Sequence, residues 1–131
     1  MDFSNTLMDA LGMETITLKP ELVEMKMPVN ANTKQPAGFL HGGASVALAE
    51  SAASIGASLT IDPTKARIFG IEINANHVKS KKDGWVMAKA VPMHVGKTTM
   101  VWEIKIVDEN EELISISRCT IGVVPMNKHK E

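Results

Sequence analysis

The stretch Leu40–Leu59, LHGGASVALAESAASIGASL, decides the fold of this 131-residue chain, because it is its longest run of small and apolar residues. Its alanines, leucines and serines favour a helix, which Asp62-Pro63 is expected to end. A sheet could approach such a helix closely on all sides, since its side chains are small. Glu50 and several serines make the stretch too polar to span a membrane.

The composition predicts one ordinary globular domain, residues 1–131, with room for a single core. An apolar fraction of 44% and a charged fraction of 22% are typical of such domains. The net charge of −1 gives no long-range field for nucleic acid or an anionic membrane. The N-terminal residues lack the basic segment of a secretory signal, and the single cysteine, Cys119, favours a reducing, cytoplasmic location.

Outside this helix, two short strands around a turn at Lys19-Pro20, and four later segments that alternate with a period of two, indicate six strands. A short helix is expected at Ser4–Leu11, with Ser4 as its N-cap, and a loop at Pro28–Phe39. The predicted strands are Glu14–Leu18, Leu22–Met27, Ile68–Val78, Trp85–Val91, Thr99–Val107 and Leu113–Val124. In the third strand, one face is expected to carry Ile71, Ile73, Ala75 and His77. One long helix and one antiparallel sheet give an α+β fold, with the sheet packed around the helix.

Glu50 is the only acid in the predicted long helix. The residues one turn away from it are small and mostly apolar, and no lysine or arginine on the helix can pair with it. Burying an unpaired carboxylate costs several kcal/mol. Two interpretations remain open: a structural acid satisfied by backbone donors or a distant basic residue, and a catalytic acid whose function offsets that cost.

The start of the helix, His41-Gly42-Gly43, has no Ser, Thr, Asp or Asn as a cap. Its first-turn amides are therefore expected to be free, and the helix dipole makes them attractive to an anion. The two glycines either allow close packing of helix on sheet or let a ligand approach the backbone. In the second case the amides would form an oxyanion hole for a carbonyl that develops negative charge.

Gly42 and Glu50 lie eight residues apart. On a helix this is about 12 Å along the axis, too far for one carbonyl to contact both. Two copies of the helix packed antiparallel would place each N-terminus near the middle of the other helix. If both features are catalytic, the sequence therefore predicts a composite site in a homodimer.

Two segments, TKQPAGFLHGGASVALAES (33–51) and GIEINANHVKS (70–80), resemble the hotdog-fold acyl-CoA thioesterases. The similarity is greatest to the branch with 1,4-dihydroxy-2-naphthoyl-CoA thioesterase, the enterobactin-pathway proofreading thioesterase and one type of 4-hydroxybenzoyl-CoA thioesterase. It extends from about Met13 to Val124. It implies a six-stranded antiparallel sheet wrapped around a central helix, dimers that pair into tetramers, and hydrolysis of an acyl-CoA without metal or cofactor.

The resemblance also implies roles for individual residues. Catalytic roles fall on Glu50, Gln35, His41 and Gly42, and substrate-binding roles on Ser54, His77 and Gly43. Glu50 would be the nucleophile or the general base, a choice that the sequence leaves open. Gln35 would hydrogen-bond near the thioester carbonyl, and the Gly42 amide would polarise that carbonyl. A thiolate leaves readily, so one carboxylate and an oxyanion hole suffice for this chemistry.

Several other readings compete with this one. Cys119 could be a nucleophile, but its mid-strand position favours a packed thiol. The histidines, including His94 at an expected hairpin, match no zinc-binding spacing. Four lysines at strand ends and turns are either solvated or in contact with the phosphates of coenzyme A: Lys79, Lys81, Lys82 and Lys97. The branch that the chain resembles favours an aromatic acyl group over a short or medium fatty one. A non-catalytic acyl-CoA binding module is the alternative to an enzyme.

Overall fold

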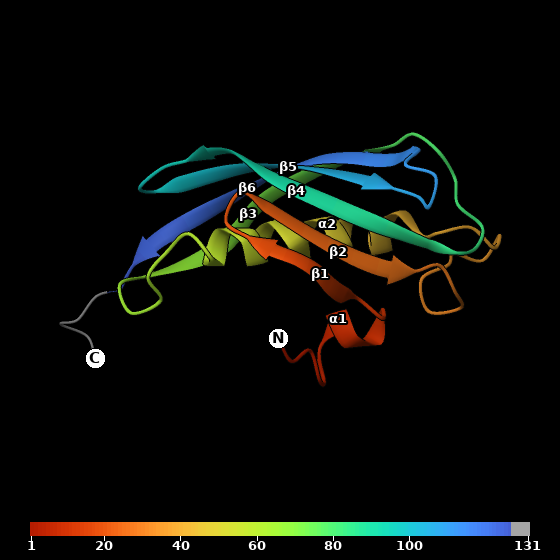
Figure 1. Cartoon of the computed structure of the whole chain (residues 1–131), viewed down its shortest axis with the longest axis horizontal. Coiled ribbons are helices and arrows are strands. Elements are labelled where there is room, and N and C mark those ends of the chain that lie inside the picture. The colour runs from red at the N-terminus through yellow and green to blue at the C-terminus, as the bar shows by residue number, and fades with distance from the viewer. Residues whose placement is uncertain (127–131) are drawn as a thin grey trace.

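The computed structural model describes residues 1–126, in which a six-stranded antiparallel sheet curves around one long helix, α2 (Gly42–Ser58) (Figure 1). The strands are β1 (Glu14–Lys19), β2 (Leu22–Pro28), β3 (Ala66–His77), β4 (Trp85–Val95), β5 (Thr99–Val107) and β6 (Leu113–Pro125). Their order in the sheet is β1-β2-β4-β5-β6-β3, so β1 and β3 form its edges. The predicted α+β fold is confirmed.

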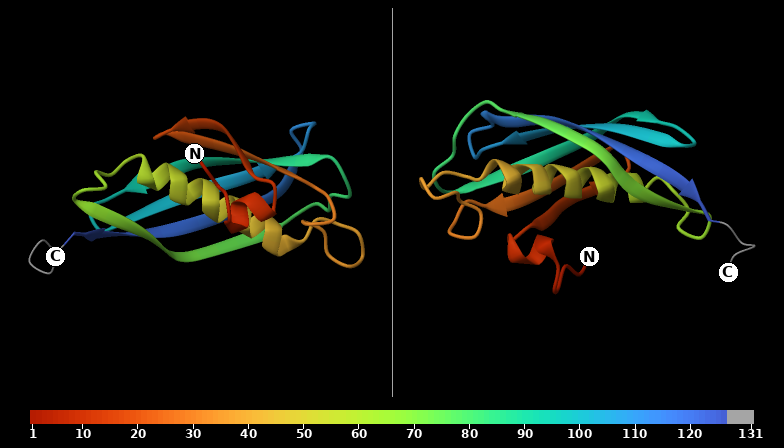
Figure 2. Two further views of the ribbon diagram at one scale, coloured as in Figure 1. Left: turned by 90° about the horizontal axis from the view of Figure 1, so that it is seen from below. Right: turned by 180° about the vertical axis from the view of Figure 1, so that it is seen from behind.

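The core lies between α2 and the inner face of the sheet. Figure 2 shows the strands of this sheet running along the helix. The helix contributes mainly alanines, and the sheet contributes the large side chains, among them Trp102 and several methionines and isoleucines. Contact is closest at Gly56, where a Cβ atom would lie 2.4 Å from the Trp102 ring. The small residues of α2 therefore let the sheet pack directly against the helix backbone.

The observed ends of several elements differ from the predicted ones. Helix α1 (Leu7–Ala10) is shorter than expected, and its N-cap is Thr6, whose hydroxyl accepts from the Asp9 N–H, rather than Ser4. Ser4 instead donates to Asp2. Strand β4 continues past Val91 to Val95, because a register shift between Pro92 and His94 accommodates the proline, which has no N–H to donate to the ladder.

Strand β3 contains a bulge that the alternation pattern did not reveal. The pairing register with β6 shifts between Gly70 and Glu72, so Ile71 is the additional residue and is 61% exposed. The prediction that Ile71 lies on the same face as Ile73 is therefore wrong. Phe69 is also largely exposed, so this edge strand presents two large apolar side chains to its surroundings.

The contact between Gly56 and Trp102 generates a prediction about stability. Gly56→Ala should lower the free energy of unfolding by about 1–3 kcal/mol, because a new methyl group would overlap the fully buried Trp102 ring. This loss should exceed the usual preference of helices for alanine over glycine. Chemical denaturation measures it, with Ser58→Ala on the exposed end of α2 as the control. A Gly56→Ala protein as stable as wild type would contradict the close packing described here.

Candidate active site

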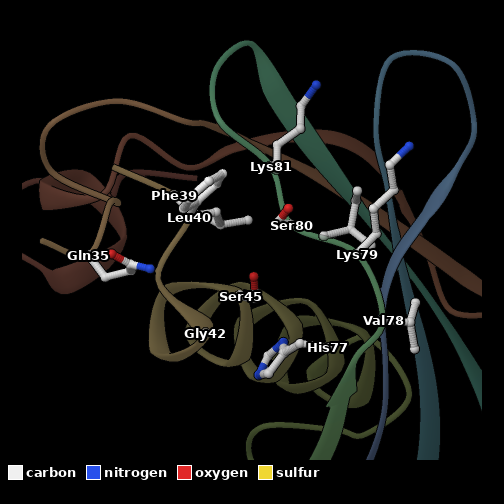
Figure 3. A pocket seen from close by; sticks show the side chains of 11 residues that line it. Gln35, Phe39, Leu40, Gly42, Ser45, His77, Val78, Lys79, Ser80 and Lys81 are labelled. Atoms are coloured by element: carbon white, nitrogen blue, oxygen red, sulfur yellow. The ribbon is translucent and has the colours of Figure 1, made fainter. Parts of the chain in front are cut away.

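The loop before α2 holds Gln35 in a hydrogen-bonded turn. The Gln35 N–H donates to the Phe39 carbonyl at 2.8 Å, and the Gly38 N–H donates to the Gln35 carbonyl at 2.9 Å. Gly38 has a φ of 95°, a value that favours glycine. The Oε1 atom of Gln35 accepts from the Ala37 N–H, which leaves its NH₂ group free to donate. Figure 3 shows this nitrogen directed toward the start of α2.

Thr33 fastens the loop to the rest of the protein. Its buried side chain donates to the Pro28 carbonyl at 2.9 Å and accepts from the Asn30 N–H at 3.0 Å. Its own carbonyl accepts from the His41 N–H at 2.8 Å, which fixes the entry to α2. Thr33 was not among the predicted site residues, because a single threonine in a polar loop gives no periodic signal.

The N-terminus of α2 is capped by a histidine, which corrects the expectation that its first-turn amides are all free. The Nδ1 atom of His41 accepts from the Gly43 N–H at 2.8 Å. The His41 carbonyl accepts from the N–H groups of Ala44 and Ser45, at 3.0 and 3.2 Å. Within residues 1–126, the Gly42 N–H is the one first-turn amide left without an acceptor. Any oxyanion site at this helix end therefore depends on Gly42 alone among these amides.

Gln35, Gly42 and His77 meet at a cavity of about 380 Å³ at this end of α2 (Figure 3). A Cβ atom on Gly42 would lie 2.9 Å from Nε2 of His77, so the imidazole at the end of β3 packs directly on the glycine. Apolar side chains, including Phe39 and Leu40, form part of the wall. Two hydrogen-bond donors and an imidazole thus face one space that can hold a small polar group.

The other predicted site residues lie elsewhere in the chain. His41 and Gly43 line a neighbouring hollow on the side of α1. Glu50 and Ser54 lie farther along α2 and do not line the cavity at its N-terminus. Glu50 is partly buried, and the ion pairs formed within residues 1–126 do not include it. A single chain therefore brings three of the seven predicted residues together and leaves the acid apart.

Gly70 on strand β3 provides the space for the Glu50 carboxylate. A Cβ atom at this position would lie 2.6 Å from Oε2 of Glu50. Because Gly70 stands beside the bulge, the edge strand passes close to the helix at the point where the acid projects. Gly70 was not predicted from the sequence as a site residue, since its partner lies 20 residues away in the chain.

Cys119 is a fully buried thiol on β6, in agreement with its interpretation as a packing residue. Burial, and to a smaller extent the negative charges of Glu50 and Glu72, together raise the pKa of the Cys119 thiol to about 11. The thiol therefore stays protonated at neutral pH and is a poor nucleophile.

Lysines gather where the cavity reaches the surface. Lys79 and Lys81 line it and form ion pairs with Glu112 and Glu109, respectively. The hydrogen bond that Lys81 donates to Glu109 raises the pKa of Lys81, so this lysine is charged at neutral pH. In residues 1–126, no group of three His, Cys, Asp or Glu side chains is arranged to hold a metal ion. None of the helices there is long and apolar enough to pass through a membrane.

With this geometry established, comparison with known proteins identifies the family. The model of the thioesterase superfamily matches residues 37–115. The chain is 49% identical over 122 residues to the 1,4-dihydroxy-2-naphthoyl-CoA hydrolase of Listeria monocytogenes, covering 93% of this chain and 98% of that protein. The chain belongs to the thioesterase superfamily.

Other relatives agree with this assignment. ComA2 of Bacillus subtilis is 55% identical over 124 residues, covering 95% of this chain and 98% of that protein. The crystal structure of a thioesterase from Haemophilus influenzae superposes with a TM-score of 0.91 at 38% identity, covering 98% of this chain and 89% of that one. The protein is therefore a thioester hydrolase with the hotdog fold, as the sequence motifs indicated.

The contact between Gly70 and Glu50 generates a prediction about this thioesterase. Gly70→Ala should displace the carboxylate, because the new methyl group would occupy the position of Oε2. The tip of a glutamate can move at little cost, so the free energy of unfolding should change by less than about 1 kcal/mol. If Glu50 takes part in the reaction, kcat/KM should fall at least about tenfold through misplacement alone. Steady-state kinetics and a denaturation curve on the same sample separate the two effects; unchanged kcat/KM would show that Gly70 does not position a catalytic group.

Proposed function

We propose that this thioesterase hydrolyses an acyl-CoA, with a carbonyl-binding site at the N-terminus of α2. The observation that supports this most strongly is a pair of donors at one cavity, the Gly42 N–H and the Gln35 NH₂ group, which have no acceptor in the part of the chain that the structure describes. Both can donate to the same thioester oxygen. His77 would then lie beside the bound group, and His41 would act indirectly by capping the helix through Gly43.

The two donors suit the chemistry of thioester hydrolysis. Attack on the carbonyl carbon places negative charge on its oxygen, and preorganised donors stabilise this charge by about 3–4 kcal/mol per donor in comparable enzymes. The helix dipole adds to the effect, because Gly42 stands at its positive end. The C–S bond then breaks and the thiolate leaves without prior protonation, so a Ser-His-Asp triad is not needed.

Glu50 would supply the remaining group, as nucleophile or as general base for water. Strand β3 gives a route by which the acid of one chain could reach the donors of another. Its outer edge has no partner strand within residues 1–126 and carries the exposed Phe69 and Ile71. Pairing of β3 with β3 of a second copy would cover these side chains and satisfy the exposed backbone groups of the edge.

The contacts along β3 agree with such pairing. Gly70 touches Glu50, and His77 packs on Gly42, so one strand carries both halves of the proposed site. Antiparallel self-pairing centred between Ile73 and Asn74 would place Gly70 of one chain opposite residue 77 of the other. Each Glu50 would then approach the donors of the other chain. We extend the proposal to a homodimer with two composite sites, which pairs further into a tetramer.

The proposed substrate is an aromatic acyl-CoA, processed in the cytoplasm. The name of the Listeria relative supports an aromatic acyl group, and the lysines beside the cavity suit the phosphates of the coenzyme. A module that only binds acyl-CoA is the alternative. The presence of Gln35, Gly42 and Glu50 together argues against it, because a binding module has no use for a partly buried acid without a cation.

The role of Glu50 can be tested by Glu50→Gln, which keeps the shape of the side chain and removes its charge. We expect kcat to fall by about 10²–10⁴-fold, because the amide can neither attack nor accept a proton. Thiol release from a panel of aromatic and fatty acyl-CoAs measures it and also identifies the preferred acyl group. Glu103→Gln, on the outer face of β5, serves as the matched control and should retain wild-type turnover. Near-normal turnover by Glu50→Gln would show that the acid is structural.

A further inference from the structure

Ser45 carries a buried hydroxyl group that no residue of the described range, 1–126, satisfies. The residue is 1% exposed, and its Oγ atom has no hydrogen-bond partner within residues 1–126. It lines the cavity at the start of α2, and Figure 3 shows the Oγ atom directed into that space. Buried hydroxyl groups in proteins nearly always have a partner, so this one is expected to meet a polar group of a bound ligand.

The position of Ser45 relative to Gly42 indicates which part of the ligand it meets. Ser45 follows Gly42 by three residues, which on a helix is about 4.5 Å along the axis. In a coenzyme A thioester, the nearest amide nitrogen is four bonds from the thioester carbon, or about 5 Å with ordinary bond lengths. If the Gly42 N–H binds the carbonyl oxygen, this amide therefore reaches the same height along the helix axis as the Ser45 hydroxyl.

The lysines determine the direction in which the ligand runs. Lys79 and Lys81 line the same cavity as Ser45, and Lys82 follows them with its amine 5.9 Å from the centre of the Phe39 ring. An acyl-CoA is anionic at its coenzyme end and not at its acyl end. The thiol part of the substrate, rather than the acyl part, is therefore expected to pass Ser45 on its way to the surface.

We propose that Ser45 is a further substrate-binding residue, whose hydroxyl group hydrogen-bonds the amide nearest the sulfur in the thiol part of the substrate. This proposal rests on the proposed function, because it takes Gly42 as the site of the thioester oxygen. The contact would align the scissile C–S bond over the donors, and it would favour thiols that carry an amide at this distance. A site that hydrogen-bonds one group discriminates against ligands that lack it.

The test compares three thioesters of one acyl group: the coenzyme A thioester, the N-acetylcysteamine thioester, which keeps the amide, and the S-pentyl thioester, which replaces it with methylenes. Ser45→Ala should lower kcat/KM about tenfold for the first two, the size expected for one lost hydrogen bond. For the S-pentyl thioester the loss should stay below about twofold, since no amide is present to lose a partner. Alanine is favoured in helices, so the variant should fold, and a melting curve verifies this.

Ser117→Ala is the matched control, because Ser117 is also buried with an unsatisfied hydroxyl but does not line this cavity. In this variant, the ratios of kcat/KM among the three thioesters should equal those of the wild type. If Ser45→Ala lowers kcat/KM equally for all three thioesters, or for none of them, the role assigned to Ser45 is wrong. The proposed function would stand in either case. A wild-type enzyme that hydrolyses other thioesters but not the coenzyme A thioester would overturn the proposed function, and the role of Ser45 with it.

Discussion

The fold depends on the contact between a helix of small residues and the sheet that curves around it. Trp102 lies against Gly56 so closely that no side chain fits between them, and the alanines of α2 allow similar approach along its length. Dispersion and the burial of apolar surface stabilise this contact only while the side chains of the helix are small enough for close packing. The Glu50 carboxylate projects from this helix toward β3, where Gly70 leaves a space for it.

This packing separates the two chemical features of α2. The N-terminal donors face a cavity formed by the loop and the end of β3, whereas Glu50 lies two turns farther along, beside the middle of β3. A rigid helix cannot bring its own N-terminus and its own middle to one atom. A second copy placed along the free edge of β3 would resolve the separation, and the proposed mechanism therefore makes assembly part of catalysis rather than an addition to it.

Much of this architecture could be predicted from the sequence. The Ala-rich stretch and the period-two segments predicted the helix and all six strands, and the Gln-Pro, His-Gly-Gly and Asn-Ala-Asn-His motifs indicated the family. The errors came from interactions that local patterns do not record. The bulge at Ile71 depends on pairing with β6, and the cap at His41 uses an imidazole where capping rules favour hydroxyl, carboxylate or amide groups. Gly70 and Thr33 owe their importance to partners on other elements, which no local pattern predicts.

Subunit complementation decides whether one site takes its donors and its acid from different chains. The experiment uses a Glu50→Ala chain and a Gln35→Ala chain, each with its own affinity tag and each nearly inactive alone. After subunit exchange between the two variants, the mixed dimer would be isolated through both tags. A shared site predicts one intact site and one doubly damaged site per mixed dimer, and hence about half of the wild-type thiol-release rate. A pure mixed dimer with no more activity than its parents would contradict the account, because it would place both residues in the same chain's site.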